Sequence, residues 1–324
     1  MKIINASVLL LLFLTQCKKH VNPPSPSNPT IFVAGSENNR ATVWKNGQAA
    51  YLGLTPGCKV SQALGMTISG SDVYVAGLQV TDSVTDLPTY WKNGVPVVLP
   101  SQYGGVAFSI AVSGSDVYVA GEFDSPSGAE TGAYLIDGQP TTLADSPWGF
   151  RAFAIAVAGS NVYIGGESVA PVYWANGQFL TLPETGYNRI DLFGIATSGS
   201  DVYLVGTYYG EGYYWKNGNP VPVTDSIFGS TETPSAIAVS GSDVYLAGGI
   251  YYACYWKNGV LVNLSDGTHT AFGTGIAVAD TSVYVCGTQT TTTNSIAKYW
   301  KNGRSVDLSD SLHYAQAVAI SLVE

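Results

Sequence analysis

A unit that returns every 39 to 45 residues constrains this chain more than any other feature of the sequence. Its fullest copy, residues 237–264, reads Ile-Ala-Val-Ser-Gly-Ser-Asp-Val-Tyr-Leu-Ala-Gly, then a short variable piece, then Tyr-Trp-Lys-Asn-Gly and a run ending at Leu264. Seven copies share an aromatic residue that is followed three positions later by glycine. These aromatics are Phe32, Tyr74, Tyr118, Tyr163, Tyr203, Tyr245 and Tyr284.

Each unit predicts four short strands joined by tight turns. In the copy above, residues 240–243 form a polar turn that contains glycine, and residues 244–247 are apolar throughout, which indicates a strand covered on both faces. Asn258-Gly259 is a strong hairpin signal, because a type I′ turn needs positive φ at both central residues. Equivalent dipeptides begin at Asn46, Asn93, Asp137, Asn176, Asn217 and Asn302. The unit is therefore predicted to be a four-stranded antiparallel meander.

The two ends of the repeat array are incomplete in complementary ways. The chain enters at residues 30–35, a second strand without a first, and leaves at residues 317–320, a first strand without a second. Pairing these strands would complete one sheet and remove two bare edges. We therefore expect an all-β fold over residues 30–324: a seven-bladed β-propeller of four-stranded antiparallel blades, closed by pairing of the C-terminal strand with the N-terminal blade.

The tryptophans of the third strands recur position for position, which favours packing between blades over a ligand cage. They are Trp44, Trp91, Trp174, Trp215, Trp256 and Trp300, and Leu135 takes this place in the third copy.

The first 29 residues are predicted to be a targeting segment and a linker rather than part of the fold. Residues 1–17 combine Lys2, an apolar run and Leu-Thr-Gln-Cys, which resembles a bacterial lipoprotein box with Cys17 as the lipidated residue. An ordinary cleaved signal peptide is the alternative, although no Ala-x-Ala site follows the apolar run. Residues 18–29 are proline-rich and are expected to be an extended spacer. By resemblance, an outer-membrane lipoprotein is expected, facing either the periplasm or the cell surface.

The Tyr-x-x-Gly ending of the second strand resembles kelch-type propellers. The whole unit resembles the Tyr-Trp-Lys-Asn-Gly repeats of secreted bacterial propeller proteins. This resemblance covers residues 30–324 and implies architecture, but it says little about function because one fold hosts many activities.

Composition and motifs exclude some functions. A formal charge of −9 argues against nucleic-acid binding. No Gly-x-Ser-x-Gly context and no metal-binding spacing of cysteines appears, so we assign no catalytic residue, no metal and no cofactor. Cys58, Cys254 and Cys286 show no pairing pattern, and Cys286 stands where other copies have alanine, which favours a small buried core residue.

Function is expected on the face where the copies differ. The turns between strands one and two and between strands three and four are short and alike, whereas the other two links, on the opposite face, vary in length and content. Loops on a rigid scaffold are the usual place for recognition. The candidate ligand-binding residues on this variable face are Tyr103, Trp148, Arg151, Tyr187, Arg189, Tyr208, Tyr209, Tyr251, Tyr252, His269 and His313.

Two further patterns on this face have a structural and a functional interpretation. An acid recurs after the fourth strand at Asp145, Glu184, Asp225, Asp266 and Asp310, either as a turn cap or as a cation ligand in each blade. His269 and His313 occupy matching positions in neighbouring copies, but two histidines without further ligands make a weak metal site.

From these observations we expect a monomeric envelope lipoprotein, anchored in the membrane by lipid, that binds a glycan or a protein through its variable face. A propeller enzyme acting on polysaccharide is one alternative. The recurrence of the acids argues against it, because glycoside hydrolysis needs one particular pair of carboxyls. A purely structural envelope protein is the other alternative.

Overall fold

A computed structural model describes residues 28–83, 85–101, 104–124, 130–143, 150–168, 171–183, 190–208, 210–223 and 233–324. These residues form 28 strands arranged in antiparallel sheets, with no helix among them. A membrane-spanning helix is accordingly not found in the described part of the chain. The prediction of an all-β fold made of four-stranded antiparallel units is confirmed.

Five sheets have four strands each. The terminal sheet runs β28 (Ala315–Val323), β1 (Thr30–Glu37), β2 (Arg40–Lys45), β3 (Gln48–Tyr51). The second runs β4 (Cys58–Ser69), β5 (Asp72–Thr81), β6 (Asp86–Lys92), β7 (Val95–Val98). The third runs β8 (Gly105–Ser113), β9 (Asp116–Asp124), β10 (Glu130–Ile136), β11 (Gln139–Thr142). The fourth runs β20 (Pro234–Ser240), β21 (Asp243–Gly248), β22 (Cys254–Lys257), β23 (Val260–Asn263). The fifth runs β24 (Ala271–Ala279), β25 (Ser282–Thr290), β26 (Ser295–Lys301), β27 (Arg304–Asp307).

The remaining eight strands form one larger sheet built from two units. One unit contains β12 (Arg151–Ala158), β13 (Asn161–Ser168), β14 (Val172–Ala175) and β15 (Gln178–Thr181). The other contains β16 (Ile190–Ser198), β17 (Asp201–Tyr208), β18 (Glu211–Lys216) and β19 (Asn219–Pro222). The units are joined where the end of β13 pairs with the start of β16, at Glu167 opposite Asp191 and Ser168 opposite Ile190. The sequence analysis did not predict this junction.

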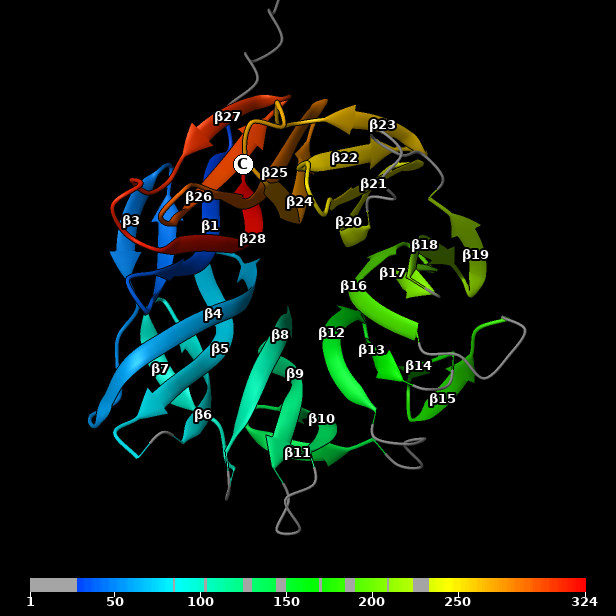
Figure 1. Ribbon diagram of the computed structural model, residues 1–324. Helices are drawn as coiled ribbons and strands as arrows, with labels where there is room; N and C mark the ends of the chain where they lie inside the picture. The colour runs from blue at the N-terminus through cyan, green and yellow to red at the C-terminus, as the bar shows by residue number, and fades with distance from the viewer. Residues whose placement is uncertain are drawn as a thin grey trace, which may run out of the picture.

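The two ends of the strand array meet in one sheet. β28 pairs antiparallel with β1 from Thr30 opposite Val323 to Glu37 opposite Ala315. The expected pairing of the last strand with the first is therefore confirmed. Figure 1 shows the sheets around a common centre, with β4, β8, β12, β16, β20, β24 and β28 nearest to it. Each of these strands contacts the corresponding strand of the next unit, and β28 contacts β4.

The core lies between the sheets. Seven clusters of buried side chains occur in the described residues, and each combines side chains from two neighbouring units. Trp256 is fully buried and packs against Tyr203 of the preceding unit. The prediction that the tryptophans pack between units is therefore confirmed. Cys286 is also fully buried, as expected, and burial raises the pKa of its thiol to about 12.

The predicted type I′ turns are confirmed in all seven units. Asn258 has a φ of 50° and Gly259 a φ of 82°, and both residues of each equivalent pair also have positive φ. Asn258 also accepts a hydrogen bond on Oδ1 from the backbone N–H of Val244, over 2.9 Å. Asparagine therefore has two roles at this position: it adopts the left-handed backbone conformation, and its side chain links two turns.

Besides a register shift at Lys59 in β4, each innermost strand carries one β-bulge, which inserts an extra residue opposite its neighbour. The register shifts fall around these extra residues, which are Leu64, Phe108, Phe153, Phe193, Ser235, Thr274 and Val318. They belong to the seven strands at the centre of Figure 1. The repeat therefore brings seven equivalent positions, filled by five residue types, to one level of the molecule.

Candidate functional site

The two ends of the sheets differ in their side-chain contacts, which recur between units at one end and vary at the other. The repeated turns lie at one end, which we call the turn face. There Asp243 Oδ1 accepts a hydrogen bond from Asn258 Nδ2 over 2.8 Å, and Asp243 Oδ2 lies 2.9 Å from Lys257 Nζ. Lys257 Nζ also lies 5.2 Å from the centre of the Tyr245 ring. The same three contacts recur around Asp72 and Asp201, so this arrangement belongs to the repeat itself.

The turn-face contacts stabilise the charged forms of both partners. The Lys257 ammonium and the Asn258 amide hold the pKa of the Asp243 carboxyl below its usual value. The carboxylate of Asp243 in turn raises the pKa of Lys257. Because these groups lie at the surface, we interpret them as a structural link between two turns rather than a reactive site.

The opposite end, which we call the variable face, holds an ion cluster that occurs only once in the described residues. Arg151, at the start of β12, donates from Nε to Glu122 Oε1 and from Nη2 to Glu122 Oε2, the latter over 2.9 Å. Its Nη1 lies 3.4 Å from Glu167 Oε2 on β13. The Glu122 side chain is only 6% exposed, compared with 36% for Arg151. A carboxylate so deeply buried needs a bidentate partner of this kind.

The junction between β13 and β16 extends this cluster. Glu167 stands opposite Asp191 across the junction, so the backbone places Glu122, Arg151, Glu167 and Asp191 along adjoining strands of neighbouring units. Of these residues, Arg151 was predicted from the sequence, whereas Glu122 and Glu167 were not. One feature of the sequence could have identified the two glutamates. The position directly after Tyr-x-x-Gly is glutamate in these two copies only, and in the others it is Ser36, Leu78, Thr207, Gly249 or Thr288.

The predicted tyrosines occupy different environments. Tyr208 is 7% exposed and packs edge to face on Tyr213, with ring centroids 6.0 Å apart, so its ring belongs to the core. Tyr252 is half-buried and lies over Gly267, whereas Tyr251 is 57% exposed. Six further predicted residues lie outside the described part of the chain: Cys17, Tyr103, Trp148, Tyr187, Arg189 and Tyr209.

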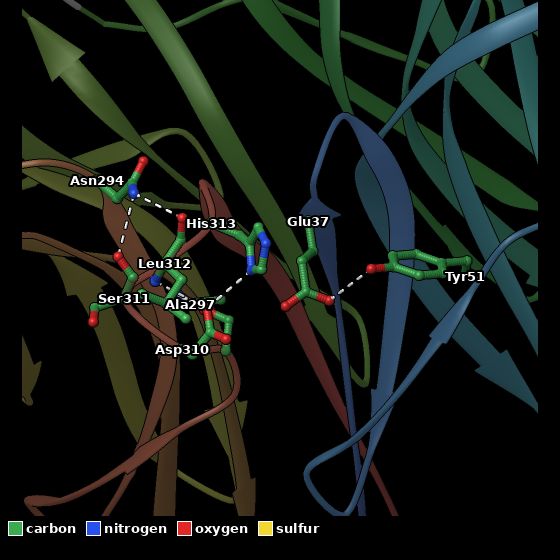
Figure 2. A network of polar contacts seen from close by, with 9 residues as sticks. Glu37, Tyr51, Asn294, Ala297, Asp310, Ser311, Leu312 and His313 are labelled. Carbon is green, nitrogen blue, oxygen red and sulfur yellow. Dashed lines mark hydrogen bonds and ion pairs between the residues drawn. The ribbon is translucent and has the colours of Figure 1, made fainter.

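The two histidines are each held within their own loop. His313 Nδ1 lies 3.2 Å from Asp310 Oδ1, as Figure 2 shows, and His269 Nδ1 lies 3.1 Å from the Thr268 hydroxyl. Asp310 and Asp266 also accept hydrogen bonds from the backbone N–H groups two residues further on, which supports the turn-cap interpretation of these acids. Asp145, Glu184 and Asp225 lie outside the described residues. No group of three or more His, Cys, Asp or Glu side chains suited to a metal ion occurs among the residues that are described.

A second polar network, absent from the sequence predictions, lies beside His313 (Figure 2). Tyr51 donates its hydroxyl to Glu37 Oε2 over 3.4 Å, and Arg40 lies 5.5 Å from the Tyr51 ring centre. Asn294 Nδ2 donates to the carbonyls of Ser311 and Leu312. These contacts fix the loop before β28 and leave Leu312 75% exposed.

A cavity of about 220 Å³ lies among the innermost strands, at the level of the bulges. Phe108, Phe153 and Phe193 line one side, and Ser235 and Thr274 line another. Phe108 and Phe153 pack edge to face, with centroids 5.1 Å apart. The Arg151 guanidinium lies 5.3 Å from the centre of the Phe153 ring, so the ion cluster and the cavity adjoin each other.

No family model and no curated protein matches the chain. Among solved structures, the chain is similar to the crystal structure of the computationally designed Ika8 protein. The superposition has a TM-score of 0.51 at 15% sequence identity and covers 92% of each chain. At this identity the similarity concerns the fold alone.

Proposed function

We propose that the described sheets are the blades of a closed seven-bladed β-propeller. Three observations support this architecture: the pairing of β28 with β1, the contact of each innermost strand with the next, and a buried cluster between each pair of neighbouring units. An experimental structure tests it. Seven sectors around one axis are expected, and an open array or another number of sectors would contradict the proposal.

The chain is further proposed to be a lipid-anchored protein of the bacterial cell envelope. Support comes from the apolar run of residues 8–14 and from Cys17 in its lipoprotein-box context, followed by the proline-rich residues 18–29. Metabolic labelling with an alkyne fatty acid tests this proposal. Labelling is expected for the wild-type chain and not for Cys17→Ala, whereas equal labelling of both would rule out Cys17 as the anchor.

The proposed activity is binding of a glycan or a protein segment by the variable face, without catalysis. The observation that carries it is the Arg151 cluster, which occurs once in the described residues, whereas the turn face repeats the same contacts from unit to unit. The variable face combines this charged cluster with exposed aromatic rings in other units, such as Tyr251, and so offers both hydrogen bonds and a stacking surface. Enzymatic cleavage of polysaccharide is less well supported, because Arg151 ion-pairs with both nearby glutamates.

A glycan array and a pull-down from envelope extract, run beside a hydrolysis assay with the full-length chain, separate these functions. Binding without product release supports the proposal, and product release supports an enzyme. Loss of binding in Tyr251→Ala, but not in the turn-face variant Lys216→Ala, would place the ligand on the variable face. The reverse pattern would contradict that placement.

A further inference from the structure

The central cavity has two chemically different sides. The bulges of three consecutive innermost strands supply phenylalanines, and Phe193, 40% exposed, has the most open ring of the three. The bulges of the next two strands supply Ser235 and Thr274. The cavity volume of about 220 Å³ leaves room for a small molecule between these two sides.

The hydroxyl side of the cavity offers hydrogen-bond acceptors, because its donors are already used. Thr274 Oγ1 lies 2.8 Å from the carbonyl oxygen of Ala317 and 3.3 Å from that of Cys286. Ser235 Oγ lies 2.8 Å from the carbonyl oxygen of Gly273 and 3.3 Å from that of Ala247. A hydroxyl has one proton, so each is donated to a carbonyl, and only oxygen lone pairs remain for a ligand.

Acceptor oxygens and aromatic faces both favour a positive charge. The face of an aromatic ring attracts cations, and the Arg151 guanidinium over Phe153 is an example within this molecule. Glu122 and Glu167 balance the charge of Arg151, so the guanidinium does not make this side of the cavity positive. The whole chain carries a formal charge of −9, and a concave site in a chain of that sign concentrates cations.

We propose that the central cavity binds one small organic ammonium ion. The alkyl part lies against Phe193 and its two phenylalanine neighbours, and the ammonium group donates to the hydroxyl oxygens of Ser235 and Thr274. This site is separate from the proposed glycan or protein site on the variable face, and either could exist without the other.

An NMR titration of the full-length chain with n-butylammonium and with 1-butanol tests the proposal. The two probes have the same number of heavy atoms and differ in charge. We expect 1-butanol to bind at least about tenfold more weakly, a ratio that corresponds to about 1.4 kcal/mol. Equal affinity of the two probes, or binding of neither, would overturn the proposal.

A pair of variants shows where the ion binds. Phe193→Leu keeps an apolar side chain at a partly exposed position, removes the aromatic face, and should weaken n-butylammonium binding about fivefold or more. Tyr51→Leu changes another exposed aromatic residue, one that does not line the cavity, and it should leave the affinity unchanged. Equal effects of the two variants would indicate non-specific binding to the acidic surface and would overturn the proposal.

A second variant tests the acceptor side. Thr274→Val keeps the shape of the side chain and removes its oxygen. It should weaken binding of n-butylammonium, which donates hydrogen bonds, and should leave binding of tetramethylammonium, which has no N–H group, nearly unchanged. Circular dichroism and the melting temperature confirm that the variant is folded. Equal weakening for both ions would contradict the assigned role of Thr274.

Discussion

The turn face and the variable face are built on the same strands but follow different rules. At the turn face, Asp72, Asp201 and Asp243 make the same contacts with lysine, asparagine and tyrosine. At the variable face, the divergence begins one residue after the repeated Tyr-x-x-Gly, where Glu122 and Glu167 reach Arg151. The comparison teaches that folding fixes the repeat as far as the glycine and leaves the positions beyond it open to specialisation.

The largest effect on stability is expected at the glycine that ends the repeated Tyr-x-x-Gly segment. A Cβ atom at Gly206 would sit 1.9 Å from the backbone oxygen of Asp191. Gly206→Ala must therefore push β16 and β17 apart, at a cost of about 3 kcal/mol or more in the free energy of unfolding. Urea unfolding measures it.

The matched control for Gly206 is the turn-face glycine of the same unit. At Gly199 a Cβ would meet no atom within 4 Å, although φ is +58°. Gly199→Ala should therefore cost only about 1 kcal/mol, the strain of a left-handed alanine. If both variants lost the same stability, the strands would not approach as closely at Gly206 as described.

The second prediction concerns the Arg151 cluster. Arg151→Met leaves the buried Glu122 carboxylate without its bidentate donor and should lower the free energy of unfolding by about 2 to 3 kcal/mol. Adding Glu122→Gln should recover much of this loss, because the orphaned charge is removed. A double-mutant cycle in urea measures the coupling.

The equivalent change on the turn face is the control for this cluster. Lys216→Met removes an ion pair with Asp201 that lies at the surface, so the loss should be clearly smaller. Equal losses at Arg151 and Lys216 would mean that the two faces do not differ energetically in the way their burial indicates.

A smaller effect is expected from acid. The pKa values of Asp72, Asp201 and Asp243 are lowered in the folded chain. Their contribution to stability is therefore present above the unfolded value of about 3.9 and is lost as the pH falls through the lower folded values. The melting temperature should fall as the pH drops below about 4, and it should fall less in Asp243→Asn. An identical fall in that variant would exclude Asp243 as a contributor.

The smallest effect is expected at the one unit that departs from Asn-Gly. Asp137 keeps the positive φ of 50° and accepts from the Val117 N–H over 3.0 Å, but it has no amide to donate to Asp116. Asp137→Asn supplies that donor and removes one negative charge from this turn. The melting temperature should rise by about 1 °C. A fall would show that this unit uses its aspartate differently.

Much of the scaffold could be predicted from the sequence because its signals are local. Asn258-Gly259 encodes its turn within two residues, and the recurrence of Trp256 identifies it as a packing residue. The ion cluster was not predictable in the same way. Glu122 and Arg151 are 29 residues apart and meet only because neighbouring sheets are packed together. The bulge at Phe153 is a matter of register between two strands, and no residue type requires it. Tyr208 was predicted to bind a ligand because it is an aromatic residue in a variable link, but its side chain is buried.

The position of β1 in its sheet has a mechanical consequence. β1 lies between β28 and β2 and is antiparallel to both. A force applied along β1 at Thr30 would load the hydrogen bonds on its two sides in shear, so that they resist together instead of opening one after another. If the segment before Thr30 tethers the molecule to a surface, the tether pulls on a strand that is hydrogen-bonded along both edges. A pulling force from a bound partner is then distributed over a whole sheet.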